Sequence, residues 1–149
     1  MILVLCLLAT SLPVAAADRI WTGASNCIWS VPGNRVGNTP PSNGDRVIYN
    51  ASSSGTRTTS NDIGSLTNLT LLVTGDPGGE VFIASNAIGL AAGGIDLSVA
   101  GQDLTISCPV TLESGQNWAV ATGRTVTVSG AIDGGGALTK AGCVGGILK

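Results

Sequence analysis

Short apolar or alternating runs recur from Val81 to Lys140, and nearly every gap between them carries Gly, Asn, Ser or Pro. Alternation of apolar and polar residues is typical of a β-strand with one buried face, and the gap residues are typical of turns. The pattern therefore predicts many short strands joined by tight turns. No stretch after residue 18 shows a helical period.

A longer period lies over the strand pattern, because apolar residues return to equivalent places about every 22 residues. One such repeat cannot bury its apolar face alone, but repeats stacked on one another form a continuous core. The three series of returning residues are Phe82, Leu104 and Val126; Ile88, Val110 and Ile132; and Leu97, Trp118 and Leu138.

We therefore predict an all-β fold, a right-handed single-stranded parallel β-helix (a solenoid) with three strands in each coil and an irregular N-terminal cap. Each coil should lie about 4.8 Å from the next, which is the ordinary strand spacing in a sheet. The handedness follows from the usual preference of parallel crossovers. The alternative is an antiparallel sandwich, which is expected to have longer strands.

A continuous apolar run opens the chain and ends at Ala15-Ala16-Ala17, small residues of the kind that a signal peptidase needs. We expect residues 1–17 to be a secretory signal peptide, cleaved before Asp18. The alternative, an uncleaved anchor helix, is disfavoured because the run is short for a bilayer. No second run of this kind follows, so the mature chain is expected to be exported and to have no membrane span.

Residues 18–62 do not follow the repeat and are expected to form an N-terminal cap and strand region, whereas residues 63–149 are expected to form the β-helix repeats. Trp21 and Trp29 lie in the first region. A solenoid needs an atypical first unit that covers its open end, and each indole can bury a large apolar area there. The alternative is that Trp21 and Trp29 are exposed glycan contacts.

The last segment, residues 134–149, starts another unit that no polar closing repeat follows. We therefore expect the C-terminal coil to be incomplete and open, as in a fragment of a longer chain. An open coil presents unpaired strand edges, so we expect end-to-end association through it.

Part of the same segment resembles a known repeat. Residues 136–142 read Gly-Ala-Leu-Thr-Lys-Ala-Gly and are similar to the core of the autotransporter-associated β-strand repeat. The Trp-Thr-Gly at 21–23, the second Trp at 29 and residues 41–49 resemble the N-terminal spacing of long exported proteins with such repeats. The residues after Gly142 depart from the family pattern, which usually continues with Thr-Leu-Thr-Leu. The resemblance implies a β-helical passenger of a Gram-negative-type bacterium, at the cell surface or outside the cell.

The chain has no His and a formal net charge of −2. The lack of His excludes Ser-His-Asp triads and His-ligated metals, and the small charge argues against a nucleic-acid partner. Parallel β-helices that degrade polysaccharides need clustered carboxylates, but the acids here do not meet on the 22-residue register. We therefore predict no catalytic residue, metal or cofactor. The candidates weighed were Asp96, Asp103, Glu113, Asp133, Arg124 and Lys140, with Asp103 and Arg124 expected as a surface ion pair.

Three cysteines follow the apolar leader: Cys27, Cys108 and Cys143. They lie far apart and show no CxxC spacing, so neither a disulfide framework nor a zinc site is expected. A single bridge between Cys27 and Cys108 is left open.

The predicted function is non-catalytic. We expect a structural or adhesive segment whose outward Thr, Ser and Asn present a repetitive polar surface to an extracellular polysaccharide or to a host or neighbouring cell. The leading alternative is a carbohydrate-binding module that uses exposed Trp21 and Trp29. A polysaccharide-degrading β-helix enzyme is the further alternative.

Overall fold

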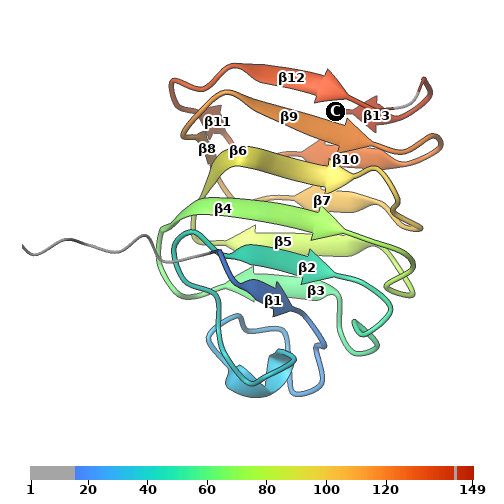
Figure 1. Ribbon diagram of the computed structural model, residues 1–149. Helices are drawn as coiled ribbons and strands as arrows, with labels where there is room; N and C mark the ends of the chain where they lie inside the picture. The colour runs from blue at the N-terminus through green and yellow to red at the C-terminus, as the bar shows by residue number, and fades with distance from the viewer. Residues whose placement is uncertain (1–15, 143) are drawn as a thin grey trace, which may run out of the picture.

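The computed structural model describes residues 16–142 and 144–149, in which thirteen strands and one short 3-10 helix, η1 (Pro32–Asn34), occur. All pairings between these strands are parallel. In Figure 1 the strands in front run to the right and those behind run to the left as the chain rises. The chain therefore winds as a right-handed parallel solenoid, as predicted.

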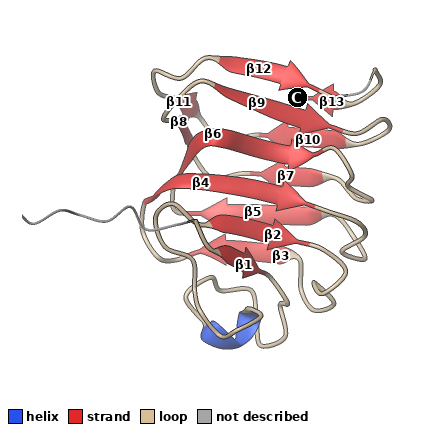
Figure 2. Ribbon diagram, in the orientation of Figure 1, coloured by secondary structure: helices blue, strands red, loops and turns tan. Residues whose placement is uncertain are grey.

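Each full coil contributes one strand segment to each of three walls (Figure 2). The first wall holds the opening parts of β4 (Leu66–Val73) and β6 (Ile88–Leu97), followed by β8 (Val110–Leu112) and β11 (Ile132–Asp133). The second wall holds β1 (Asp18–Ile20), β2 (Arg46–Tyr49), the closing parts of β4 and β6, β9 (Gln116–Val120) and β12 (Leu138–Ala141). The third wall holds β3 (Thr58–Asn61), β5 (Val81–Ser85), β7 (Leu104–Ile106), β10 (Thr125–Val128) and β13 (Ile147–Leu148).

Two strands are long because they continue from the first wall into the second. β4 turns this corner at Asn68 and β6 turns it at Gly94, and both residues have positive φ values, 56° and 54°. The register between the two strands shifts over the same stretch. Asn and Gly are the residues that adopt this left-handed conformation at least cost, so the sequence places each bend.

The predicted series of stacked residues is confirmed in one case and corrected in two. Ile88, Val110 and Ile132 stack in register. Leu104 stacks on Val126, but its other neighbour is Val81, so the prediction for Phe82 is wrong by one residue. The prediction for Trp118 is wrong as well, because Trp118 stacks between Ile95 and Lys140. Leu97 pairs with Val120, and Leu138 pairs with Gln116.

The apolar core is one continuous column inside the three walls. Leu90, Ile95, Ile106 and Trp118 are fully buried in it. Leu90, Ile95 and Ile106 come from one coil and Trp118 from the next, so the column is continuous only because the coils stack. Burial of apolar area stabilises a protein by about 25 cal/mol per Å². Here that stabilisation depends on contacts between successive coils, so a single coil would not be stable alone.

Parallel stacking begins at Asp18, within the predicted cap and strand region of residues 18–62. β1 pairs with β2, β2 with β4, and β3 with β5. The irregular part is the loop between β1 and β2, which carries η1 and closes the lower end of the solenoid in Figure 1. We call residues 21–45 the cap.

At the other end, the last described coil has a neighbour only on the side of the cap. Ile132 of β11 is 45% exposed, whereas Val110, which occupies the same place one coil earlier, is 0% exposed. Within the described residues the core is thus open at this end. End-to-end association through it stays a prediction.

The two described cysteines are free thiols, Cys27 half-buried and Cys108 buried, so the bridge between them is not formed. Burial raises the pKa of the Cys108 thiol to about 11, which keeps it protonated and unreactive at neutral pH. Cys143 and residues 1–15 of the expected signal peptide lie outside the described residues. The described part of the chain contains no helix that is long and apolar enough to span a membrane.

Candidate functional site

Both indoles of the cap are fully buried. The Trp21 Nε1–H donates to the Thr56 carbonyl at 2.6 Å, and the Trp21 ring centroid lies 6.2 Å from that of Tyr49. Trp21 and Trp29 therefore fill the end of the core, and neither presents a face on which a sugar could stack. The alternative of an exposed platform has no support at these two residues.

A cation lies between the two indoles. The guanidinium carbon of Arg35 is 4.3 Å from the Trp21 ring centroid and 5.4 Å from that of Trp29. Arg35 is 2% exposed, and none of its guanidinium nitrogens has a hydrogen-bond partner among the described residues. Burial lowers its pKa to about 10. The aromatic faces supply the attraction that a carboxylate would otherwise supply, so the cap is closed by a cation–π stack.

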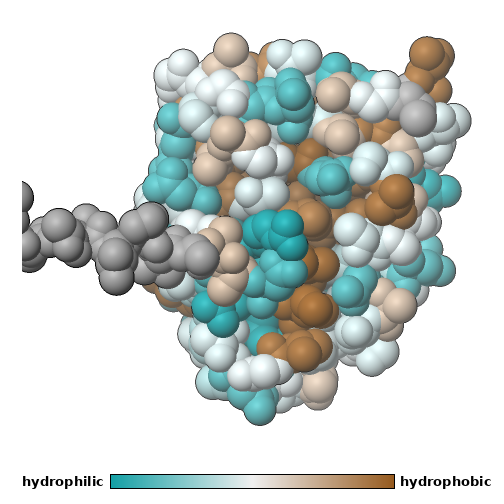
Figure 3. Space-filling view, viewed as in Figure 1, coloured by the Kyte–Doolittle hydropathy of each residue, from teal (hydrophilic) through white to brown (hydrophobic). Residues whose placement is uncertain are grey.

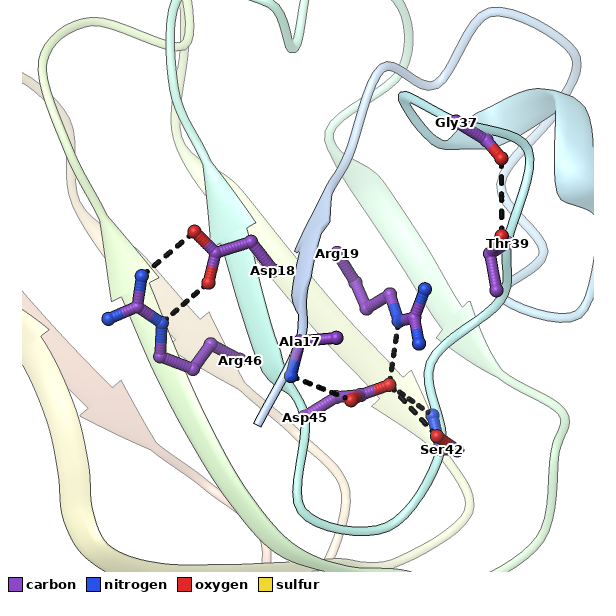
Figure 4. A network of polar contacts seen from close by, with 8 residues as sticks. All are labelled: Ala17, Asp18, Arg19, Gly37, Thr39, Ser42, Asp45 and Arg46. Atoms are coloured by element: carbon purple, nitrogen blue, oxygen red, sulfur yellow. Dashed lines mark hydrogen bonds and ion pairs between the residues drawn. The ribbon is translucent and has the colours of Figure 1, made fainter. Parts of the chain in front are cut away.

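A second polar cluster anchors β1 to the start of β2 (Figure 4). The Asp45 carboxylate accepts from Arg19 Nε at 2.7 Å, from the Ser42 N–H and hydroxyl at 2.9 Å each, and from the Ala17 N–H at 3.1 Å. Burial alone would raise the pKa of Asp45, but these hydrogen bonds outweigh it and hold the pKa below its ordinary value. The cluster fixes the first strand and is structural.

The acids weighed for catalysis are not brought together. Asp103 pairs with Arg124 at 3.8 Å and accepts from the Thr125 N–H at 3.0 Å, which confirms the expected surface pair. Asp96 accepts from the Ser98 N–H two residues on, at 2.8 Å, as in an ordinary turn. Among the described residues there is no group of three acids or cysteines that could hold a metal ion.

The Glu113 side chain extends toward the cap. It lies over Gly89, one coil nearer the cap, where a Cβ would clash with its carboxylate. Its Oε2 accepts the Asn68 N–H, from the coil before that. One carboxylate therefore bridges three successive coils across the first wall, and it can do so because position 89 has no side chain.

The outer face of the second wall carries a partly apolar column near the cap. Ile20, Ile48 and Leu72 stack in register there, and the column continues with Asp96 and then Ala119. Figure 3 views this side of the molecule and shows a hydrophobic stripe that gives way to polar residues away from the cap. Ile48 is buried even so, because its stacked neighbours cover it.

The outer face of the third wall has a different character. Phe82 stacks between Thr58 of β3 and Thr105 of β7, and Thr105 stacks on Thr127 of β10. Phe82 is 38% exposed, whereas Trp21, Trp29, Trp118 and Tyr49 are buried. The single Phe of the chain is thus its one exposed aromatic residue among those described. We call this surface, centred on Phe82, Thr58 and Thr105, the Phe82 face.

Polar groups lie on the same strand as Phe82 and on the strands beside it. The Thr105 hydroxyl donates to the Glu80 carboxylate at 2.7 Å, and the hydroxyls of Ser60 and Ser85 lie 2.6 Å apart. An exposed aromatic ring beside hydroxyls and a carboxylate can stack on an apolar surface while the polar groups exchange hydrogen bonds with its rim. Among the described residues, this is the surface best suited to contact a ligand.

Comparison of the chain with family models, with curated proteins and with solved structures finds no match.

Sequence reasoning missed the Phe82 face for an identifiable reason. On a strict 22-residue period, Phe82 shares its place with Leu104 and points inward. The corner from the third wall to the first takes one residue more after β5 than after β7, and Ser85 at this corner has a φ of 81°. A shift of one residue moves a side chain to the opposite face of a strand. Ser85-Asn86 was the available signal, because both residues are typical of turns.

Proposed function

We propose that this chain is a non-catalytic segment of an exported protein, with a structural or adhesive role at a cell surface or outside the cell. The observation that supports this most strongly is the uninterrupted parallel stack from β1 to β13, closed at one end by the cap. A solenoid of this kind offers long walls of regularly spaced side chains, and stacking makes it stiff along its axis.

The outward side chains fit the same role. On the third wall they are mainly the short polar residues Thr58, Ser60, Thr105, Ser107 and Thr127. Together with the apolar leader, and with the resemblance of residues 136–142 to the autotransporter-associated repeat, they favour a passenger-type segment of a Gram-negative-type bacterium. Its partner would be a polysaccharide or the surface of a host or neighbouring cell.

Export is tested by expressing the full chain in a Gram-negative host and determining its N-terminus by mass spectrometry. The expected product begins at Asp18 and is found outside the cytoplasm. A Leu5→Arg variant places a charge in the apolar leader and serves as the control that should stay uncleaved in the cytoplasm. Retention of the unaltered chain in the cytoplasm with Met1 or Ile2 at its start would contradict the proposal.

A further inference from the structure

We propose that the Phe82 face is a binding surface for an uncharged polysaccharide. This inference deepens the adhesive role proposed above, and it rests on that role because the chain would encounter such a polymer outside the cell. The first step is the position of the ring. Phe82 lies on β5, between β3 and β7, with a threonine in register on either side, and it is 38% exposed. Its exposed ring can stack on the C–H face of a pyranose.

The second step is the set of hydrogen-bonding groups beside the ring. Sugar hydroxyls donate and accept, and threonine and serine hydroxyls do both, whereas a carboxylate accepts only. Thr58, Thr105 and Ser60 supply hydroxyls on the adjacent strands, and Glu80 supplies a carboxylate that already accepts from Thr105. This mixture complements the rim of a neutral sugar ring.

The third step is charge, which distinguishes neutral from acidic polymers. Arg124 is paired with Asp103 and also donates to the Gly101 carbonyl at 2.9 Å. Arg57 donates to the Ser53 and Gly55 carbonyls at 3.2 and 3.0 Å. Glu80 takes part in none of the ion pairs among the described residues.

Arg124 is offset by Asp103, and Arg57 is held in place by neutral carbonyls but keeps its charge. The Glu80 carboxylate, which is bonded to Thr105 on the Phe82 face and has no ion-pair partner among the described residues, repels an anion there. A polymer of uronic acids should consequently bind less well than a neutral one.

The fourth step is size. The third wall has five strands, which span roughly 19 Å at about 4.8 Å from strand to strand. This length accommodates several consecutive sugar rings. Binding would therefore come from an extended chain lying across the wall, and it would not require a pocket.

The experiment compares retention of the full chain and its variants on cellulose, on a soluble β-glucan and on polygalacturonate. Retention on insoluble cellulose is measured by sedimentation, and the soluble polymers are tested by affinity electrophoresis. We expect retention by at least one neutral glucan, weaker retention by polygalacturonate, and a loss of about tenfold in association constant for Phe82→Ala.

Two matched variants separate binding from folding. Val99→Ala truncates a 67% exposed apolar residue in the turn after β6, away from the Phe82 face, and should leave retention unchanged. Phe82→Trp should preserve retention and add a fluorescent reporter whose emission changes with added glucan. Phe82 lies outside the core, so Phe82→Ala should lower the unfolding temperature only modestly and stay folded at the temperature of the binding assay, which thermal unfolding checks.

The proposal is overturned if neither neutral glucan is retained, or if Phe82→Ala binds as well as the parent chain. It is also overturned if polygalacturonate binds more tightly than both glucans. The proposed structural role does not depend on these outcomes, because export and N-terminal processing are measured separately.

Discussion

A glycine that lies beneath a carboxylate offers the sharpest test of how the coils are joined. Gly89 to Ala would place a methyl group where the Glu113 carboxylate now lies. The φ of Gly89 is outside the left-handed region, so the backbone itself can accept alanine. The substitution should therefore displace the side chain of Glu113 and break its hydrogen bond to the Asn68 N–H, two coils away.

The magnitude follows from two opposing effects. Replacing Gly by Ala where the backbone allows it stabilises a protein by about 0.4–1 kcal/mol, because the unfolded chain loses freedom. A hydrogen bond to a charged group contributes about 1.5–3 kcal/mol, and the lower limit applies because Glu113 is exposed. Gly89→Ala should therefore reduce the free energy of unfolding by about 0.5–1 kcal/mol.

In a Glu113→Ala background the sign should reverse. No carboxylate then occupies the space, and Gly89→Ala should stabilise by about 0.5 kcal/mol. The coupling energy from this double-mutant cycle should be about 1.5 kcal/mol. Urea unfolding followed by tryptophan fluorescence measures all four proteins.

Gly115→Ala is the matched control, since the nearest atom to its added methyl group is the Ala137 carbonyl oxygen at 4.0 Å. It should have the same effect whether or not Glu113 is present. Equal effects of Gly89→Ala in the two backgrounds would refute the bridging role of Glu113.

Three further predictions concern buried polar groups. The pKa of Asp45 is held below its unfolded value, so its contribution to stability is complete above about pH 4 and is lost as pH falls through the folded pKa. Asp45→Asn should remove that part of the acid dependence and lower the free energy of unfolding by about 1–2 kcal/mol at pH 7, measured by urea unfolding. An unchanged dependence of stability on pH would contradict this prediction. Arg35→Met should leave the free energy of unfolding unchanged or raise it by up to about 3 kcal/mol, because a buried cation without hydrogen-bond partners is replaced by an apolar side chain. A decrease of more than about 1 kcal/mol would show instead that the cation–π contacts outweigh the cost of burying the cation. Trp118→Phe should lower the free energy of unfolding by about 1–3 kcal/mol, because the buried Gln116 Oε1 loses the indole N–H that now donates to it at 2.8 Å. An unfolding temperature equal to that of the parent chain would show that this hydrogen bond does not contribute to stability.

The agreement between sequence and structure is closest where a pattern reports on one wall at a time. Ile88, Val110 and Ile132 alternate with polar residues, and their common spacing places them in one stack. Agreement fails where corner lengths differ. Phe82 is displaced by one residue and Trp118 by two from their expected partners, because period counting assumes that every corner has the same length.

By itself, the sequence determined that the chain is all-β, that it coils in parallel, and that its first region closes one end. Those properties arise from local alternation and from a repeat whose apolar face needs neighbours, and both can be counted along the chain. Only the tertiary structure decided that Arg35 is enclosed by Trp21 and Trp29, that Glu113 reaches Asn68, and that Phe82 faces outward. The first depends on the irregular path of the cap and the second on the space above Gly89. The third depends on the length of one corner, and a corner of variable length leaves no period to count.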